Sequence, residues 1–209
     1  MSDSHDTLPD QRTTYHHGDL REQLLAVVRD LVEVHGPEGF SVAEAARRAG
    51  VSTAAPYKHF KDRTDLLNAL VSDAMDRLAV QMARGRDQYA VGTYEAVAGI
   101  GQAYIDFAKA EPGIFRLMFS LTEGHEDDDC IQRKGQDCRE IVETACGACL
   151  GEGASEQAAV LSAYILWTSV HGHAFLSIDK KNIDEAQSLD DWDFLMAVTS
   201  AVLDASARP

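Results

Sequence analysis

The stretch Ser41–Leu67, SVAEAARRAGVSTAAPYKHFKDRTDLL, determines our interpretation of the whole chain. Its first residues have the S-x-x-E pattern of a capping box, which predicts a short helix that begins at Ser41 and ends at Gly50. A second short helix is expected from Ser52, as N-cap, to about residue 59 or 60. Two short helices joined by a tight turn with a glycine are typical of a helix-turn-helix. The first helix would pack closely through its small residues Ala45, Ala46 and Ala49.

The second helix has the composition of an element that enters the major groove of DNA. Thr53 and Ala54 at its start are small enough for a groove about 12 Å wide. The threonine hydroxyl can bond to a base edge or a phosphate, and alanine methyl groups can contact thymine. Pro56 is expected to cost this helix only one early hydrogen bond. On spacing alone, the alternative is an ordinary helical hairpin with charged outer residues.

Helical periodicity extends in both directions from this stretch. Residues 1–15 are polar and aperiodic, which predicts a flexible arm. From Asp19, apolar residues recur every three or four positions until Gly36 and Pro37 end the helix. Asp62 is expected to cap a fourth, longer helix, whose apolar stripe is Leu67, Leu70, Val71, Ala74, Leu78 and Met82. Further helices are expected near residues 92–110, 112–121, 129–150, 155–178 and 189–206.

No strand-like alternation of apolar and polar residues interrupts this pattern, so the predicted fold class is all-α. We expect an N-terminal three-helix helix-turn-helix domain at residues 16–61 and a larger helical domain at residues 62–209. A chain of 209 residues is long enough for one small and one medium-sized domain.

Positive charge is confined to a small part of the chain. The net charge of −15 argues by itself against DNA binding. Residues 1–70, however, carry eight Lys and Arg against 11 Asp and Glu, whereas the remainder carries 11 against 23. Within residues 47–63, Asp62 is the only acid beside the basic residues Arg47, Arg48, Lys58, Lys61 and Arg63. Such a distribution suits a protein that touches DNA with one small face.

The sequence predicts a cytoplasmic protein without membrane association. No apolar run approaches the roughly 20 residues needed to span a bilayer. The polar, acid-containing start of the chain lacks the basic and apolar regions of a signal peptide.

The stretch Ser41–Leu67 resembles the DNA-binding domain of TetR-family regulators. Residues 57–60, YKHF, are similar to the Y-x-h-F signature of that family, and residues 64–67, TDLL, stand where E-x-L-L is common. Arg63 occupies a position where the family usually has lysine. One subgroup has openings similar to residues 15–21, YHHGDLR, and typically contains the Ala-Pro-Tyr of residues 55–57.

The resemblance to this subgroup continues in the second half of the chain. Residues 111–119, EPGIFRLMF, are similar to its N-P-G-L-F-R-L-M-F stretch, and residues 167–172, WTSVHG, match its W-x-x-x-H-G motif. The resemblance implies phosphate contacts, which fix register without reading sequence, for Ser41, Tyr57, His59, Lys61 and Arg63. Our candidates for base contacts are Arg48, Thr53, Ala54 and Lys58. Tyr57 has a competing role as a packed ring, and Phe60 is assigned to the core.

The resemblance also implies a homodimer in which the last two long helices of each copy form a four-helix bundle. Small and apolar residues at near-helical spacing would let partner helices approach closely; they are Ala159, Ala163, Leu166, Val170 and Ala174. The alternative is that these helices are buried in their own subunit. A two-fold dimer would read two half-sites about 34–36 Å apart or somewhat more, so the expected operator in double-stranded DNA is a short palindrome.

A small-molecule effector is the remaining partner that the resemblance implies. An apolar cavity with one polar handle could be lined by Phe107, Phe115, Met118, Phe119, Trp167, His171 and Phe175. The alternative is that these aromatic residues are plain core. The expected function is a transcriptional repressor that leaves its operator when the effector binds.

Two further features of the sequence concern its function. Cys138, Cys146 and Cys149 suggest, as an alternative function, a thiol- or metal-responsive regulator, because cysteines three apart on a helix share a face. Small apolar fillers are the competing explanation for these cysteines. The chain contains no nucleophile elbow, phosphate-binding glycine loop or HExxH motif. We therefore predict neither an enzyme nor a bound cofactor or metal.

Overall fold

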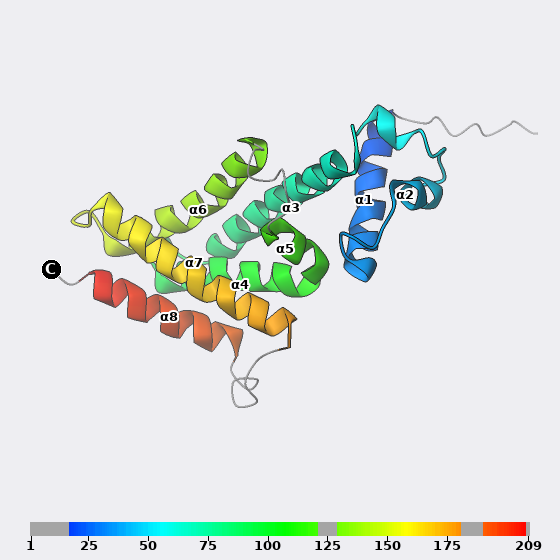
Figure 1. Cartoon of the computed structure of the whole chain (residues 1–209). Coiled ribbons are helices and arrows are strands. Elements are labelled where there is room, and N and C mark those ends of the chain that lie inside the picture. Colours follow the sequence, from blue (N-terminus) through cyan, green and yellow to red (C-terminus); the bar gives the residue numbers. More distant parts are fainter. Residues whose placement is uncertain (1–16, 121–128, 181–189, 208–209) are drawn as a thin grey trace, which may run out of the picture.

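The computed structural model describes residues 17–120, 129–180 and 190–207. These residues form α-helices and one short 3-10 helix and contain no strand, so the predicted all-α class is confirmed (Figure 1). The arm expected at residues 1–15 lies outside the described residues. In chain order the elements are α1 (His17–His35), α2 (Val42–Arg48), η1 (Pro56–Lys58), α3 (Arg63–Arg86), α4 (Tyr94–Ala110), α5 (Pro112–Phe119), α6 (Asp129–Leu150), α7 (Glu156–Ile178) and α8 (Asp191–Ser206).

Local sequence signals set the helix boundaries near the N-terminus. α1 ends at His35, and the next residue, Gly36, has a φ of +74°, in the left-handed region that glycine adopts without strain. Ser41 caps α2 by accepting a backbone N–H of the first turn at 3.1 Å, and Asp62 caps α3 in the same way at 2.8 Å. Gly50, with a φ of +70°, follows the end of α2. These predicted boundaries are confirmed.

The second helix of the motif differs from the prediction. An α-helix was expected from Ser52 to residue 59 or 60, but only Pro56–Lys58 are helical, and they form a 3-10 turn. The preceding residues make a turn in which the N–H of Ala55 donates to the carbonyl of Ser52 at 2.9 Å. Pro56 has no N–H to make the next bond to Ser52, which an α-helix would require. The expectation that this proline costs little was therefore wrong.

Helix α3 connects the N-terminal elements to the rest of the molecule. It packs against α1 near its start and against α4, α5 and α6 along its length. All residues of its predicted apolar stripe are buried. α3 and α4 approach closely at two glycines, because a Cβ on Gly85 would lie 2.3 Å from the carbonyl oxygen of Gly99.

Helices α7 and α8 pack against each other and against α4, on the side of the molecule away from α1 and α2 (Figure 1). The α7 residues that were expected to meet a partner helix, from Ala159 to Ala174, are instead buried in their own subunit. This is the outcome that the alternative predicted. Between Glu156 and Asp179, α7 carries no Asp, Glu, Lys or Arg, so its opposite face is uncharged. Within the described residues, no helix combines the length and the apolar character needed to cross a membrane.

Candidate functional site

The turn before η1 and η1 itself carry several exposed side chains. Thr53, Ala54 and Lys58 are exposed, and 58% of Tyr57 is accessible to solvent. This exposure favours the contact role of Tyr57 over its competing role as a packed ring. Phe60 is only 3% exposed, so its assignment to the core is confirmed.

The basic side chains predicted around this surface fall into two groups. Arg48 pairs with Glu44 of its own helix at 2.9 Å. Arg63 is half-buried: its guanidinium donates to the carbonyl of Pro37 and lies 5.0 Å from the centre of the Phe40 ring. Both arginines are thus engaged within the protein.

The remaining members of the predicted surface are more accessible. Lys58 and Lys61 are exposed, and neither forms an ion pair among the described residues. His59 is half-buried, whereas Ser41 is exposed at the first turn of α2. The accessible members of the predicted surface are therefore Ser41, Tyr57, Lys58 and Lys61.

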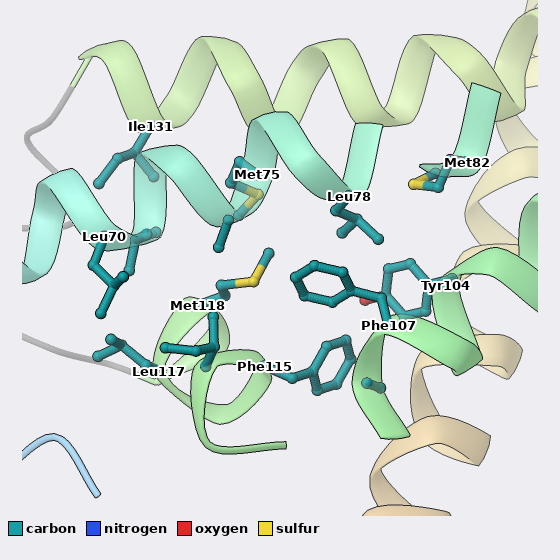
Figure 2. Packing of buried hydrophobic residues seen from close by; sticks show 14 of the residues in the cluster. Leu70, Met75, Leu78, Met82, Tyr104, Phe107, Phe115, Leu117, Met118 and Ile131 are labelled. Atoms are coloured by element: carbon teal, nitrogen blue, oxygen red, sulfur yellow. The ribbon is translucent and has the colours of Figure 1, made fainter. Parts of the chain in front are cut away.

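A cavity of about 450 Å³ lies among α3, α4, α5, α6 and α7. Of the residues predicted to line a ligand site, it contains Met118, Phe119 and Trp167. Figure 2 shows Met118 of α5 directed toward Met75 of α3 in this part of the interior. The apolar part of the wall is completed by Leu78, Met82, Tyr104, Ile131, Val142, Val160, Ala163 and Tyr164.

The other predicted ligand residues do not line this cavity. Phe107 and Phe115 are fully buried core residues, as the alternative proposed. His171 and Phe175 pack behind the wall, with His171 in ring contact with Phe119 at 4.6 Å and with Trp167 at 5.5 Å between centroids. His171 therefore contacts two residues of the cavity wall, Phe119 and Trp167, but does not line the cavity itself.

The polar handle expected of His171 is bound to a tyrosine. The Tyr104 hydroxyl and the Nδ1 of His171 are 2.7 Å apart. Burial lowers the pKa of His171 and raises the pKa of Tyr104, so both groups are neutral near neutral pH. In the tautomer that carries its proton on Nε2, the phenol donates to Nδ1 of the imidazole. The cavity interior thus offers a ligand mainly apolar surface, and polar groups occur on α6, where Gln132, Arg139 and Glu143 line the wall.

Sequence reasoning missed the contributions of α3 and α6. Leu78 and Met82 belong to the predicted apolar stripe of α3, whereas Met75, which also lines the cavity, was not part of it. Periodicity places a residue inside without saying whether a neighbour fills the space beside it. On α6, the residues of the cavity wall alternate with charged residues, so the sequence of this helix shows no continuous apolar stripe. Only the packing of five helices reveals which of these side chains border a void.

The three cysteines of the alternative reading do not form a common site. The Cys138 thiol points to the carbonyl of Met75 at 3.9 Å and the Cys149 thiol to that of Thr93 at 3.3 Å. Burial raises the pKa of Cys138 to about 11 and that of Cys146 to about 12, so both thiols are protonated near neutral pH. Among the described residues, no three His, Cys, Asp or Glu side chains are grouped to hold a metal ion.

Besides the surface of the cavity, the outward face of α7 carries an accessible apolar surface. Residues spaced by three or four positions are exposed along it: Leu161, Ile165, Thr168, Gly172 and Leu176. A Cβ added to Gly172 would meet no atom within 4 Å. We call this stripe the α7 face.

The fold and these surfaces define an all-helical protein with an N-terminal helix-turn-helix unit and a C-terminal unit that contains a cavity. Two family models match the chain: "Bacterial regulatory proteins, tetR family" at residues 24–70 and "Tetracyclin repressor-like, C-terminal domain" at residues 97–199. Together they cover more than two thirds of the chain. The chain belongs to the TetR family. Membership in a family of regulatory proteins supports the prediction that it is not an enzyme.

Individual relatives are more distant. The chain is 32% identical over 103 residues to the nucleoid occlusion factor SlmA of Haemophilus influenzae, a match that covers 47% of this chain and 45% of that protein. It is 31% identical over 107 residues to an HTH-type transcriptional regulator of Mycobacterium tuberculosis, covering 48% and 45%. The matches thus span about half the length of these curated relatives.

Similarity in three dimensions extends over almost the entire chain. A protein of unknown function from Rhodococcus sp. RHA1 superposes with a TM-score of 0.79 at 27% sequence identity. This match covers 95% of the present chain and 100% of the Rhodococcus chain. The arrangement of the two units is therefore shared by a solved structure.

Proposed function

We propose that the chain is a sequence-specific DNA-binding transcriptional regulator, a repressor that a small-molecule effector releases from a palindromic operator. The exposed surface of Thr53, Ala54, Tyr57 and Lys58 carries this proposal. A tyrosine that is 58% exposed between the buried Pro56 and Phe60 makes little packing contribution, whereas its hydroxyl suits a phosphate contact. Membership in the TetR family supports the same function.

Selection of bound duplexes from a random DNA pool tests this function. We expect a short palindrome and an affinity that falls steeply with salt concentration, because cationic contacts release counterions from DNA. Tyr57→Phe should weaken binding to all sequences similarly, whereas Thr53→Ala or Lys58→Ala should change the recovered sequence, at about 1–3 kcal/mol per lost base contact. Recovery of no sequence in dilute salt would contradict the proposal.

The partner of the α7 face is proposed to be a second copy of this chain. Apolar residues at helical spacing, such as Leu161 and Leu176, are exposed there on a helix that has no charged residue in its middle. A gap at Gly172 would allow a partner helix to approach closely. A two-fold arrangement through this face fits a palindromic operator.

The cavity is proposed to bind the effector. Its volume of about 450 Å³ lies within the range of small-molecule sites. The hydroxyl of Tyr104 and the Nδ1 of His171 are hydrogen-bonded to each other, so the interior of the cavity favours the apolar part of a ligand. Gln132 and Arg139 of α6 offer polar contacts. Such a site should take an amphipathic organic molecule, and anilinonaphthalene sulfonate is a suitable fluorescent probe. Its fluorescence should rise on binding and should fall when the cavity is filled by Gly135→Leu.

Several expectations from the sequence are retained as part of this proposal. They are the division into a helix-turn-helix domain at residues 16–61 and a regulatory and dimerisation domain at 62–209, a cytoplasmic location, and membership in the subgroup with the W-x-x-x-H-G motif. Trp167 at the cavity wall and His171 behind it give that motif a structural role.

A further inference from the structure

A second, smaller cavity adjoins the main one. It has a volume of about 30 Å³ and lies among α3, α4, α6, α7 and α8. The two cavities share part of their walls, and the shared residues are Met82, Tyr104, Val142 and Trp167. Figure 2 shows two of them, Met82 and Tyr104, on the neighbouring helices α3 and α4. We call the smaller cavity the end chamber.

The end chamber is an apolar space in the interior. The residues that line it without lining the main cavity are all buried, and apart from one threonine they are apolar. They are Val97, Ile100, Gly101, Leu166, Val170, Leu195 and Thr199. A ligand would therefore enter the end chamber from the main cavity, past the shared wall.

Helix α8 closes the end chamber on the far side from the main cavity. It contributes Leu195 and Thr199 to the end chamber and no residue to the main cavity. α4 and α8 approach closely here, because a Cβ on Gly101 would lie 2.4 Å from Cδ2 of Leu195. The same Cβ would lie 3.5 Å from Cγ2 of Val170 in α7. This close packing keeps the end chamber narrow.

The size of the end chamber restricts what can enter it. One water-sized group needs about 10–15 Å³ of such space, so the end chamber holds roughly two groups of this size. The last carbons of an unbranched alkyl chain fit such a space, whereas a ring or a branched end is too large. Met82 in the shared wall has a flexible, unbranched side chain that adapts to irregular spaces. A chain can therefore pass beside it.

The polar groups of the site lie on another part of the wall. Gln132, Arg139 and Glu143 of α6 line the main cavity and not the end chamber. Arg139 is exposed and donates to Oε1 of Gln136 at 3.1 Å, and it pairs with no carboxylate among the described residues. Its guanidinium is therefore available to a ligand carboxylate, the partner that it binds most strongly.

We propose that the effector is an unbranched alkyl carboxylate whose chain end occupies the end chamber and whose head group binds Arg139 in the main cavity. The end chamber then selects ligands by the length of the chain, and Val97 and Ile100 of α4 determine this specificity. The inference rests on the proposed function, since it names the class of molecule that the cavity takes as effector.

Calorimetric titration of the full chain with saturated, unbranched carboxylates tests this assignment. The series lengthens by one carbon at a time and is used below the concentrations at which micelles form. Affinity should rise about fourfold for each added carbon that becomes buried and should fall beyond an optimum length. A carboxylate with the optimum number of carbons but a terminal cyclohexyl ring should bind about tenfold more weakly, because its end cannot enter the end chamber.

Two conservative substitutions in α4 change the size of the end chamber in opposite directions. Ile100→Val removes one carbon from the wall and should lengthen the optimum chain by about one carbon. Val97→Ile adds one carbon and should shorten the optimum chain by about one carbon. The matched control is Ile105→Val, because Ile105 is completely buried in the same helix and lines neither cavity. The control should keep the original optimum.

An optimum length that moves in neither variant, or that moves equally in Ile105→Val, would overturn the proposal. So would equal binding of the straight and the ring-ended carboxylate. Tighter binding of unbranched amines than of carboxylates would place the head group at Glu143 and would overturn the ligand class. Failure of the proposed function has a different result, because these titrations contain no DNA: the optimum length is observed, while the preferred carboxylate leaves the affinity for DNA unchanged.

Discussion

At the residue scale, side chains of the same type have different roles because of their neighbours. Arg63 and Lys61 are two positions apart and were both assigned to phosphates. Lys61 is exposed, whereas Arg63 lies over the Phe40 ring and donates to the carbonyl of Pro37. Arg63 therefore links the start of α3 to the α1–α2 loop and has a stabilising role besides any contact with DNA.

Arg63→Ala should lower the free energy of unfolding by about 1–2 kcal/mol, because the variant loses a cation–π contact and leaves a carbonyl without its charged donor. Lys61→Ala should change it by less than about 0.5 kcal/mol, as exposed substitutions usually do. Urea unfolding followed by circular dichroism measures both. Equal stability of the two variants would show that the internal contacts of Arg63 contribute nothing.

His171 should make the stability depend on pH. Burial lowers its pKa below the ordinary value of 6.5, so in mildly acidic solution the unfolded chain binds a proton that the folded chain does not. Stability from this residue is complete above pH 6.5 and is lost as pH falls from there toward the folded-state pKa. His171→Gln keeps an acceptor for Tyr104 and should reduce the loss of stability between about pH 7.5 and about pH 5.5. An unchanged pH profile would contradict this assignment.

At the element scale, helix ends supply both stability and function. Ser41 caps α2 and also lies on the face proposed to contact DNA. A capping residue must accept a hydrogen bond from the first turn, while a phosphate contact additionally requires that no negative charge be present there. The two roles can therefore be separated by choosing substitutions that keep one and remove the other.

Ser41→Ala should destabilise the protein by about 1 kcal/mol, the usual cost of losing an N-cap. Ser41→Asp should retain the stability, because aspartate caps helices as well as serine does, but should weaken binding to every DNA sequence by charge repulsion. Thermal unfolding and DNA titrations distinguish these effects. If Ser41→Asp bound DNA as tightly as the unsubstituted protein, Ser41 would not be near a phosphate.

At the scale of the whole molecule, the exposed apolar residues differ in their surroundings. Leu161 lies in the α7 face beside other apolar side chains, whereas Val91 is isolated in the turn before α4 and is 89% exposed. A contiguous apolar surface indicates an interaction site, and a single exposed valine does not. This contrast supplies a matched test of the proposed homodimer.

Leu161→Asp should convert the dimer to a monomer, because it places an unpaired charge in the interface. Val91→Asp should leave the oligomeric state unchanged. Sedimentation velocity at several protein concentrations measures the masses. A dimer that persists in Leu161→Asp, or a monomer already present in the unsubstituted protein, would rule out the α7 face as the interface.

The sequence by itself determined the helices and most of their ends. Ser41 and Asp62 cap their helices through hydrogen bonds to residues three positions away, and the positive φ of Gly36 and Gly50 is a property of single residues. Local sequence patterns were therefore sufficient to predict these helix ends. The error at η1 was also local, since the N–H that Pro56 lacks belongs to the next hydrogen bond of the predicted helix. Membership in the TetR family was likewise predicted from short motifs.

Only the tertiary structure decided how those helices meet. Periodicity places Met75 and Phe107 on inner faces alike, but only the packing of α3 to α7 leaves a void beside the first and fills the space around the second. Hydrogen bonds from the backbone N–H groups of Gly113 and Ile114 to the carboxylate of Glu33 join residues about 80 positions apart. Contacts between residues so far apart in the sequence depend on how the whole chain folds, and local sequence patterns do not predict them.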